Sequence, residues 1–379
     1  EKVLISGYVE KIGLEDCFWS VSVDGEKKKD ARFLKNHTEA VEVLIDELFK
    51  NNIVQSLDEI KGVGHRVLHG GEKYSDSVLI TDEVIKDIED LTKLGPLHHP
   101  GNLAGIRAMK EALKDVPMVA VFDTAFHQTM PKVNYMYPVP MEWYTKYGVR
   151  RYGFHGISHN YLANRMSEIL GKKEFKLITC HLGGGCSIEA IKDGKCVAAS
   201  LGFSPNAGLM MGTRCGDIDS QMIPFVMNKS GMSLEEVMNE LNRNSGFLGV
   251  SGVSSDSRDI EAGVNNGDER CILAQNIFVN RCVEYIAKYY VLLGGVDAIC
   301  FAAGLGKWIT SVTMTAFYVL LYYVWRERYQ IKGKNSLTIA TYALAGLRIA
   351  LCMMPQNDWL SASAPLSWGI YRNIPFAVL

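Results

Sequence analysis

Two glycine-rich segments of this chain each follow an apolar stretch typical of a buried strand. HLGGGCS (residues 181–187) follows FKLITC, and AAGLG (302–306) follows GVDAICF. Glycine allows the backbone to approach a ligand closely, and successive N–H groups in such a turn form an anion-binding nest. One glycine-rich turn is weak evidence. Two of them after strands in one chain favour a site for the phosphates of a nucleotide.

Three charged residues stand near turns of the same kind. Arg66 lies in GHRVLHGG and Arg214 in MGTRCGD, both among glycines, and Asp123 stands where VAVFDTAF leaves a strand. The guanidinium fork suits a carboxylate or a phosphoryl group, although a salt bridge is the more common role. A carboxylate at a strand end either turns the chain or orients a nucleophile or, through water, Mg²⁺.

Two histidines in GFHGISH, His155 and His159, have a spacing that could bind a metal ion. Gly156 between them, and the lack of the glutamate that a zinc-protease helix carries, argue against metal. A histidine that donates to a transferring phosphoryl oxygen agrees better with the phosphate loops. In SSDSRD, Asp256 and Arg258 either contact a nucleotide or cap the helix that follows.

The elements that would position these residues alternate between strand and helix. Apolar, β-rich runs predict strands within 62–71, 116–126, 175–185 and 295–306. Amphipathic spacing predicts helices at 82–93, 102–114, 158–170, 233–244 and 268–292, the fourth with Ser233 and Glu236 at capping-box spacing. This alternation indicates an α/β fold, in which ligands collect at the carboxyl ends of the strands.

Composition describes an ordinary soluble protein. The 379 residues carry a formal net charge of −2 and 22% charged residues, with no basic excess that would indicate a nucleic-acid partner. The first residues, EKVLISGYVEKIG, do not read as a signal peptide, so we expect a cytoplasmic protein. Nine cysteines form no C-x-x-C pair and no zinc spacing, which predicts reduced thiols.

The last fifth of the chain, from Lys307, differs from the rest. Only two of the 42 acidic residues, but four of the six tryptophans, lie after residue 306. Residues 309–325 carry no charge and are followed by basic residues. A run of 17 apolar and hydroxyl residues is near the lower limit of a membrane span, so a membrane anchor is an alternative reading of this segment.

Taken together and in this order, the motifs resemble those of the acetate kinase family, within the acetate and sugar kinase/heat-shock 70/actin superfamily. The similar segments include GHRVLHGGEKYSDS, PLHHPGN, VAVFDTAFHQTMP, RYGFHGISH, HLGGGCS, MGTRCGDID, SSDSRDI and AAGLG, spread over residues 1–306. The resemblance implies two actin-like (ribonuclease H-like) α/β domains with a cleft between them. Their expected bounds are 1–124 and, for the nucleotide-binding domain, 125–306, followed by an atypical apolar tail at 307–379.

The activity implied by the resemblance is reversible transfer of the ATP γ-phosphate to acetate, giving acetyl phosphate and ADP, with Mg²⁺ or Mn²⁺. The implied partners are these small molecules and a second copy of the chain in a homodimer. The implied catalytic residues are Asp123, His155 and Arg214; Arg66 would share the carboxylate and phosphoryl group with Arg214, and no metal ligand is assigned. The apolar pocket for the acyl group would be lined by Leu97, Phe154 and Pro205. The nucleotide would meet His181, Leu182, Gly183, Gly184, Gly185, Asp256, Ser257, Arg258, Gly304, Leu305 and Gly306.

The chain departs from the family pattern in three places. Gly184 stands where the family usually has Asn, and the chain begins beyond the family's N-terminal Asn-Ala-Gly-Ser-Ser-Ser-x-Lys segment. Lys307 and Trp308 stand where the family has a Glu-Asn pair, and the tail after them replaces the stretch that leads to a metal-associated Glu in the family. A shifted reading frame would explain the tail, because Gly-Lys-Trp can be encoded by GGA-AAA-TGG, which contains codons for Glu-Asn when it is read one base later. A catalytically impaired relative, and a propionate or butyrate kinase, are therefore alternatives to acetate kinase activity.

Overall fold

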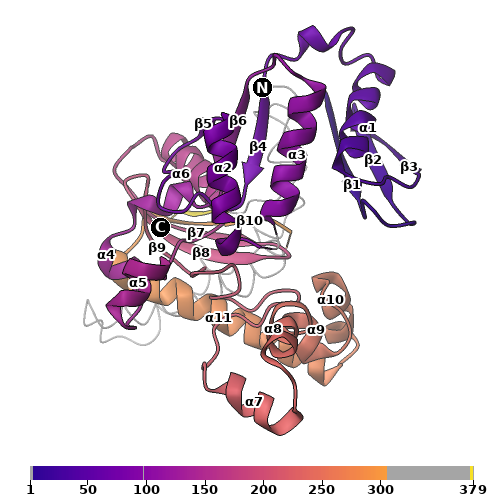
Figure 1. The fold of residues 1–379 in the computed structure, drawn as a ribbon. Coiled ribbons are helices and arrows are strands. Elements are labelled where there is room, and N and C mark those ends of the chain that lie inside the picture. Colours follow the sequence, from indigo (N-terminus) through magenta and orange to yellow (C-terminus); the bar gives the residue numbers. More distant parts are fainter. Residues whose placement is uncertain (1–2, 97, 305–375, 379) are drawn as a thin grey trace, which may run out of the picture. The chain divides into compact units, whose positions relative to one another are not determined.

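The computed structural model describes residues 3–96, 98–304 and 376–378 (Figure 1). The chain divides into two compact units, of which the first ends at Gln128 and the second begins at Thr129. Leu97 and the apolar segment 309–325 fall outside the described residues. Among the residues that are described, no helix is long and apolar enough to cross a membrane.

The first unit begins with a three-stranded antiparallel meander, in which β2 pairs with both neighbours. Asp24 and Gly25 join β2 to β3 with φ values of 48° and 88°, the positive pair that a two-residue hairpin turn requires. A helix, α1, begins after Asn36, whose side chain accepts a hydrogen bond from the Glu39 N–H. The elements are β1 (Ile5–Glu10), β2 (Phe18–Val23), β3 (Glu26–Ala31) and α1 (His37–Lys50).

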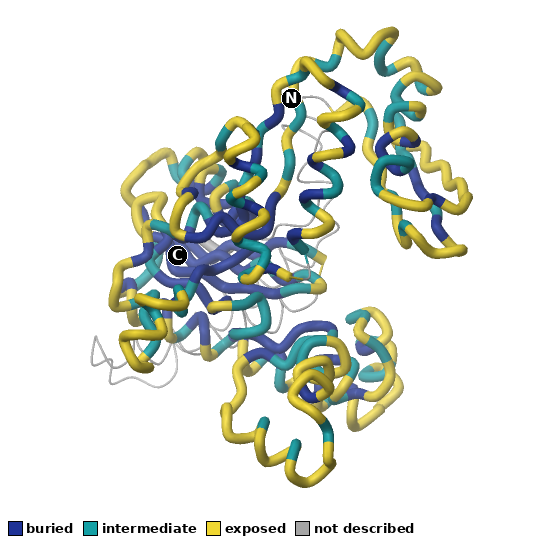
Figure 2. Tube along the Cα trace, in the orientation of Figure 1, coloured by how far each residue is buried: buried dark blue, intermediate teal, exposed yellow. Residues whose placement is uncertain are grey.

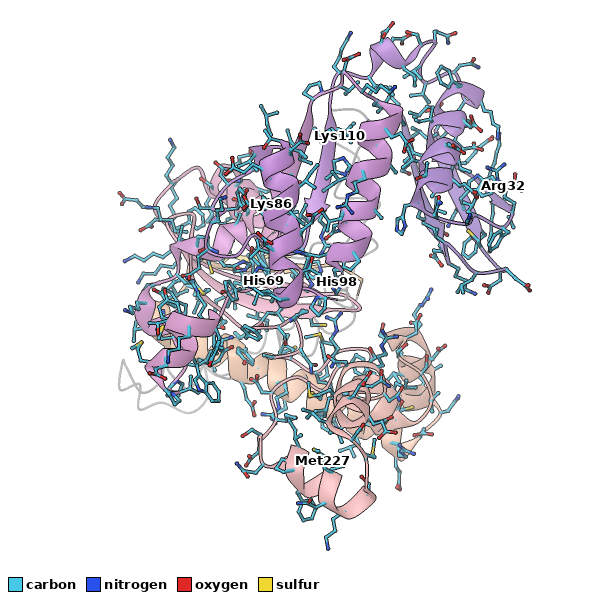
Figure 3. All side chains as sticks on the ribbon, in the orientation of Figure 1. Arg32, His69, Lys86, His98, Lys110 and Met227 are labelled. Atoms are coloured by element: carbon cyan, nitrogen blue, oxygen red, sulfur yellow. The ribbon has the colours of Figure 1, made fainter. Side chains whose placement is uncertain are left out.

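A second sheet of the first unit has the order β4-β6-β5, with β4 parallel to β6 and β5 antiparallel to it. Its core contains Ile88 of α2, Ile106 of α3 and Phe122 of β6, all almost fully buried. Figure 3 shows Lys86 on α2 and Lys110 on α3. The elements are β4 (Val63–Val67), β5 (Val78–Leu79), α2 (Asp82–Asp90), α3 (His99–Ala112), β6 (Met118–Phe122) and the 3-10 helices Leu57–Glu59, Leu91–Leu94 and Ala125–Thr129.

The second unit is built on a five-stranded sheet of order β11-β10-β7-β8-β9. Strand β10 runs parallel to β7, and the remaining neighbours pair antiparallel. Strands β7, β8 and β10 are almost entirely buried, as the dark segments of Figure 2 show. The strands are β7 (Lys176–Leu182), β8 (Cys186–Lys192), β9 (Lys195–Ala199), β10 (Ala298–Ala302) and β11 (Phe376–Val378).

Two long helices pack on this sheet. Helix α6 contacts β7, and α11 contacts β7 and β8 from the opposite face (Figure 1). Helix α11 also packs against α9 and α10, so one helix joins the sheet to a helical subdomain. The helices are α4 (Lys132–Tyr135), α5 (Met141–Tyr147), α6 (Gly156–Leu170), α7 (Met222–Ser230), α8 (Leu234–Arg243), α9 (Gly246–Ser251), α10 (Ser257–Asn265) and α11 (Glu269–Leu293).

The predicted helices and strands are found in the structure, with ends that move by a few residues. The five predicted helices correspond to α2, α3, α6, α8 and α11, and the four predicted strands to β4, β6, β7 and β10. The predicted capping box of α8 is formed, since the Ser233 hydroxyl accepts from the Glu236 N–H and the Ser233 N–H donates to the Glu236 carboxylate. Arg66, which stands among glycines in the sequence, lies within strand β4.

Candidate active site

In the first unit, Arg66 and Asp123 form an ion pair at the carboxyl end of the parallel strands β4 and β6. Arg66 Nη2 donates to Asp123 Oδ2 at 2.5 Å. Asp123 follows β6 directly, and its N–H donates to the Val67 carbonyl of β4, so the sheet itself fixes the position of the carboxylate. The Asp123 side chain is 2% exposed, whereas that of Arg66 is 60% exposed. The pair therefore combines a buried, fixed acceptor with a guanidinium that solvent or a ligand can reach.

In the second unit, strands β7 and β8 place polar residues on one face of a buried sheet. Thr179 is registered opposite Glu189, and His181 opposite Ser187. Because side chains two residues apart point to the same side of a strand, these four lie on one face. Thr179, Ser187 and Glu189 are completely buried, so this face needs hydrogen-bonding partners.

Those partners come from the start of helix α6. His155 Nδ1 lies 2.8 Å from Ser187 Oγ, and the rings of His155 and His181 are 4.3 Å apart between centroids. Ser158 Oγ lies 2.9 Å from His181 Nδ1. His155 itself has left-handed backbone angles (φ 61°, ψ 21°) at the N-cap of α6. Strained backbone of this kind in a residue other than glycine clusters at functional sites, where the surrounding contacts hold it in place.

Gly185 lies where His155 and Arg214 meet. A Cβ at this glycine would be 3.3 Å from His155 Nε2 and 3.5 Å from Arg214 Nη1. None of the three glycines of the HLGGG loop has a positive φ, so the backbone conformation alone does not require glycine. At Gly185, glycine is favoured because two hydrogen-bond-donating side chains approach the backbone closely. Two donors beside a half-buried glycine form a suitable cradle for a phosphoryl group.

Arg214 is held in place by its own loop. Its Nη1 donates to the Pro205 carbonyl at 3.1 Å, and its backbone carbonyl accepts from the Met211 N–H. Burial lowers the pKa of Arg214, yet a guanidinium remains charged at any physiological pH. A positive charge that is partly desolvated and fixed in orientation interacts strongly with an anion, because water neither screens it nor has to reorganise.

Further backbone segments converge on the glycine loop. The Gly212 N–H donates to the Gly184 carbonyl at 3.4 Å, and a Cβ at Gly212 would be 2.9 Å from the Ser255 carbonyl. On the other side, a Cβ at Gly183 would be 3.4 Å from Ala303 Cβ, and Ala303 has a φ of 70°. The loops that carry HLGGG, MGTRCG, SSDS and AAG are thus neighbours, although they are far apart in the sequence.

The Cys186 thiol forms a hydrogen bond to the backbone of the glycine loop. Cys186 Sγ donates to the Gly183 carbonyl at 3.1 Å. Burial raises the pKa of Cys186 to about 12, so that the group stays a protonated donor. The eight cysteines of the described region form no disulfide with one another.

The predicted residues in SSDSRD have a clear local role. The Asp256 side chain caps helix α10 by accepting from the Arg258 N–H, and it also pairs with the Arg258 guanidinium. This hydrogen-bonded pair lowers the pKa of Asp256 to about 2. Ser257 is the first residue of α10. The helix-cap alternative is therefore confirmed for Asp256, while the Arg258 side chain is 86% exposed and accessible to a ligand.

Other predicted site residues are less informative. The side chains of Phe154 and Leu182 are almost fully buried, so a ligand could reach Leu182 only through its backbone. Gly304 is exposed and lies in the turn after β10. Leu97, Leu305 and Gly306 lie outside the described residues.

Sequence reasoning did not single out Thr179, Ser187 or Glu189, although all three lie in the mostly apolar strands β7 and β8. The available signal was alternation: the polar residues at 179 and 181, and those at 187 and 189, recur with a period of two in FKLITCHL and CSIEAI. A polar stripe on a buried strand pair predicts a hydrogen-bonded network on that face.

Comparisons with known proteins show the family to which this chain belongs. The model of the acetokinase family matches residues 1–337, which extends past the end of the similar segments noted in the sequence. The acetate kinases of Bacillus cytotoxicus and Geobacillus kaustophilus are 54% and 52% identical to this chain over 309 residues, which is 81% of this chain and 78% of each relative.

Solved structures give the same answer for the fold. The structure of Porphyromonas gingivalis acetate kinase aligns with a TM-score of 0.77 and 46% identity, covering 81% of this chain and 78% of that one. The structure of a propionate kinase from Francisella tularensis aligns with a TM-score of 0.79 and 36% identity, covering 84% and 82%. Since the family model, the curated relatives and the solved structures all lead to one family, this chain belongs to the acetokinase family and is a kinase with the actin-like α/β fold of acetate kinases.

Proposed function

We propose that this protein transfers the γ-phosphate of ATP to acetate, forming acetyl phosphate and ADP, and that it catalyses the reverse reaction. The observation that carries the proposal is the Gly185 cradle, where His155 Nε2 and Arg214 Nη1 face the same glycine backbone. Phosphoryl transfer requires little covalent chemistry from the protein, so that catalysis consists mainly of alignment and stabilisation of charge. A fixed guanidinium and an imidazole beside a glycine loop supply both.

The roles of the individual residues follow from their chemistry. In the transfer, a carboxylate oxygen of acetate attacks the γ-phosphorus, the bond to the ADP oxygen breaks, and negative charge spreads over the equatorial oxygens. Arg214 and His155 donate to those oxygens. Arg66 holds the acetate carboxylate, and Asp123 orients Arg66. Phe154, Pro205 and Leu97 would supply the apolar surroundings of the methyl group.

The glycine loops and the residues around them suit the nucleotide. Backbone N–H groups of Gly183, Gly184 and Gly185 would face the phosphates, next to His181 and the segment that ends at Gly304. The exposed Arg258 would contact the nucleoside part or its phosphates.

A divalent ion, Mg²⁺ or Mn²⁺, fits the residues at Asp123. Mg²⁺ in kinases is usually bound by one or two carboxylates together with substrate phosphates and water. Asp123 offers one carboxylate, of which Oδ2 is engaged by Arg66. When bound, the ion would neutralise charge on the β- and γ-phosphates. The protein residues would meanwhile bind, orient and donate hydrogen bonds as described.

A propionate kinase is the second candidate, because the Francisella tularensis propionate kinase is among the similar structures at 36% identity. One methylene changes binding in an apolar pocket by only about 1–3 kcal/mol, so that related carboxylates are poorly separated by such a pocket. We propose a homodimer in the cytoplasm as the working form. Helix α7 is consistent with association, since it has no buried residue and exposes Met222 and Phe225.

The test is formation of acyl phosphate by the purified full chain with ATP and Mg²⁺, trapped with hydroxylamine, for acetate, propionate and butyrate in parallel. The proposal predicts product with acetate as the best substrate. A better rate with propionate would favour the second candidate. Absence of product from all three, with the acetate kinase of Bacillus cytotoxicus active alongside, would indicate a catalytically impaired family member.

A further inference from the structure

His159 is buried next to His155 and connects it to the interior of the sheet. His159 Nε2 lies 2.7 Å from Ser187 Oγ and 3.4 Å from Glu189 Oε1, and its Nδ1 lies 2.7 Å from Thr179 Oγ1. Ser187 Oγ is in turn 2.8 Å from His155 Nδ1. The atoms thus form a continuous chain from Glu189 through His159 and Ser187 to His155, all within the second unit.

The direction of the hydrogen bonds follows from the acceptors around His159. Its Nε2 faces Glu189 Oε1, a carboxylate oxygen that can only accept, so that an unprotonated Nε2 would place one lone pair against another. A proton on Nε2 satisfies both neighbours, whether or not His159 also carries a proton on Nδ1. Ser187 Oγ therefore accepts from His159.

That assignment decides the state of His155. A serine hydroxyl has one hydrogen, and with its oxygen accepting from His159, the Ser187 hydroxyl can direct this hydrogen to His155 Nδ1 at 2.8 Å. His155 Nδ1 is then an acceptor, and the ring proton of neutral His155 resides on Nε2. Nε2 is also the atom that approaches the Gly185 backbone beside Arg214.

We propose that Glu189, His159 and Ser187 are positioning residues that hold His155 in the tautomer with a proton on Nε2, directed toward the phosphoryl site. Hydrogen bonds along this series of side chains fix both the orientation of the His155 ring and the nitrogen that carries its proton. The role of the tautomer in phosphoryl transfer rests on the proposed function, whereas the tautomer itself does not.

A purely structural role for the network makes different predictions. Buried polar groups are hydrogen-bonded for stability alone, and removal of one partner then lowers stability without changing the proton position on His155. The useful variants therefore change which hydrogen-bond donors and acceptors are present and alter the side-chain volume only a little.

The first measurement is the ¹⁵N spectrum of the full chain labelled at histidine, at a pH about 2 units above the ordinary histidine pKa of about 6.5. Signals of His155 are assigned by their loss in a His155→Gln variant. The proposal predicts a pyridine-like Nδ1 and a pyrrole-like Nε2 for His155. It further predicts that Ser187→Ala shifts both signals toward the average of two exchanging tautomers. A pyrrole-like Nδ1 in the unsubstituted chain, or identical spectra of the two proteins, would overturn it.

The second measurement is steady-state kinetics. Because general acid–base and donor groups contribute 10²–10⁴-fold, loss of positioning in Ser187→Ala is expected to lower kcat about tenfold, with the KM for ATP within about twofold. His159→Gln keeps an amide donor toward Ser187, so it should retain more activity than His159→Leu. Equal kcat values for these two variants, both folded, would contradict the proposed direction.

A matched control separates positioning from stability. Ser251 is also a buried hydroxyl in the second unit, and it donates to the Phe247 carbonyl at 2.6 Å. Ser251→Ala should lower the melting temperature as Ser187→Ala does, but leave the His155 spectrum and kcat unchanged. If it alters both, the effects of Ser187→Ala are structural and the proposal fails. The spectra need no turnover, so an inactive chain would refute the proposed function and still permit the tautomer test.

Discussion

The two units present their charged site residues in different ways. In the first unit, Asp123 is fixed by the sheet and Arg66 is tied to it by one ion pair, with most of the guanidinium exposed. In the second unit, His155 and Arg214 are embedded among backbone and side-chain partners, and the strained backbone of His155 shows how strongly its surroundings determine its position.

This difference indicates a division of labour. A donor that is already oriented and desolvated stabilises developing charge without reorganising at the moment of reaction, which suits His155 and Arg214. An exposed arginine with one fixed partner can exchange solvent for a substrate carboxylate, which suits Arg66. We expect substitutions at His155 and Arg214 to act mainly on kcat and substitutions at Arg66 to act mainly on acetate binding.

The largest effect is expected for Arg214→Ala. Loss of a fixed guanidinium at the phosphoryl group should lower kcat by about 10³-fold or more, in line with arginines that stabilise phosphoryl-transfer transition states. The measurement is the hydroxylamine-trap assay at saturating ATP and acetate. Arg281→Ala, which removes an exposed arginine paired with Glu284 on α11, is the control and should retain activity. A decrease confined to KM would break the proposed contrast between the units.

For the first unit, Arg66→Ala should raise the KM for acetate by about 10²-fold, since a charge-assisted hydrogen bond of about 1.5–3 kcal/mol to the carboxylate is lost. It also leaves the buried Asp123 carboxylate without its partner, which should lower the free energy of unfolding by about 1–3 kcal/mol.

A double variant separates these two effects of Arg66. Arg66→Ala with Asp123→Asn removes the unpaired charge, so chemical denaturation should show stability recovering while acetate binding stays weak. Recovery of both together would mean that Arg66 acts only through the stability of its unit.

The sequence was sufficient to predict five helices, four strands and the motifs, because these depend on local patterns. Amphipathic spacing located α2, α3, α6, α8 and α11, and the Ser233–Glu236 pair located the start of α8. The dipeptides Asp24-Gly25 and Asp193-Gly194 are an equally local signal, because Asp-Gly favours a two-residue hairpin turn. Both pairs have the positive φ values of such turns, but the two hairpins were not predicted.

The network around His155 could not be derived in the same way. Whether His159 is a metal ligand or an internal partner depends on which residues face it, and Ser187 and Glu189 reach it only through the register of β7 with β8. Sequence spacing alone does not determine which nitrogen of a histidine carries a proton. The helix cap at Asp256 was one of two open readings, and the hydrogen bond from the Arg258 N–H shows that the cap is formed, while a contact with a nucleotide stays a prediction.

A smaller effect is expected from two adjacent glycines in the second unit. Gly185→Ala places a methyl group 3.3 Å from His155 Nε2 and 3.5 Å from Arg214 Nη1, where the transferring group must fit. We expect kcat to fall about tenfold, because small misplacements of aligned groups are costly. Gly184→Ala is the matched control, since a Cβ there meets nothing within 4 Å, and it should stay within about twofold of the unsubstituted chain. Equal decreases in kcat for the two variants would show that the close approach of His155 and Arg214 to Gly185 does not matter for phosphoryl transfer.

The smallest effect, and the only gain, is expected for Gly184→Asn. The position has open space for a side chain and a φ that is not positive, so asparagine fits without strain. One added hydrogen bond to a nucleotide phosphate contributes about 0.5–1.5 kcal/mol, which corresponds to a roughly two- to tenfold lower Kd for ATP by calorimetry. The effect on acetate binding should be negligible, because Arg66 and not the loop is expected to hold the carboxylate. If Gly184→Asn tightened acetate and ATP equally, the loop would serve both substrates, and the proposed division between the two units would have to be abandoned.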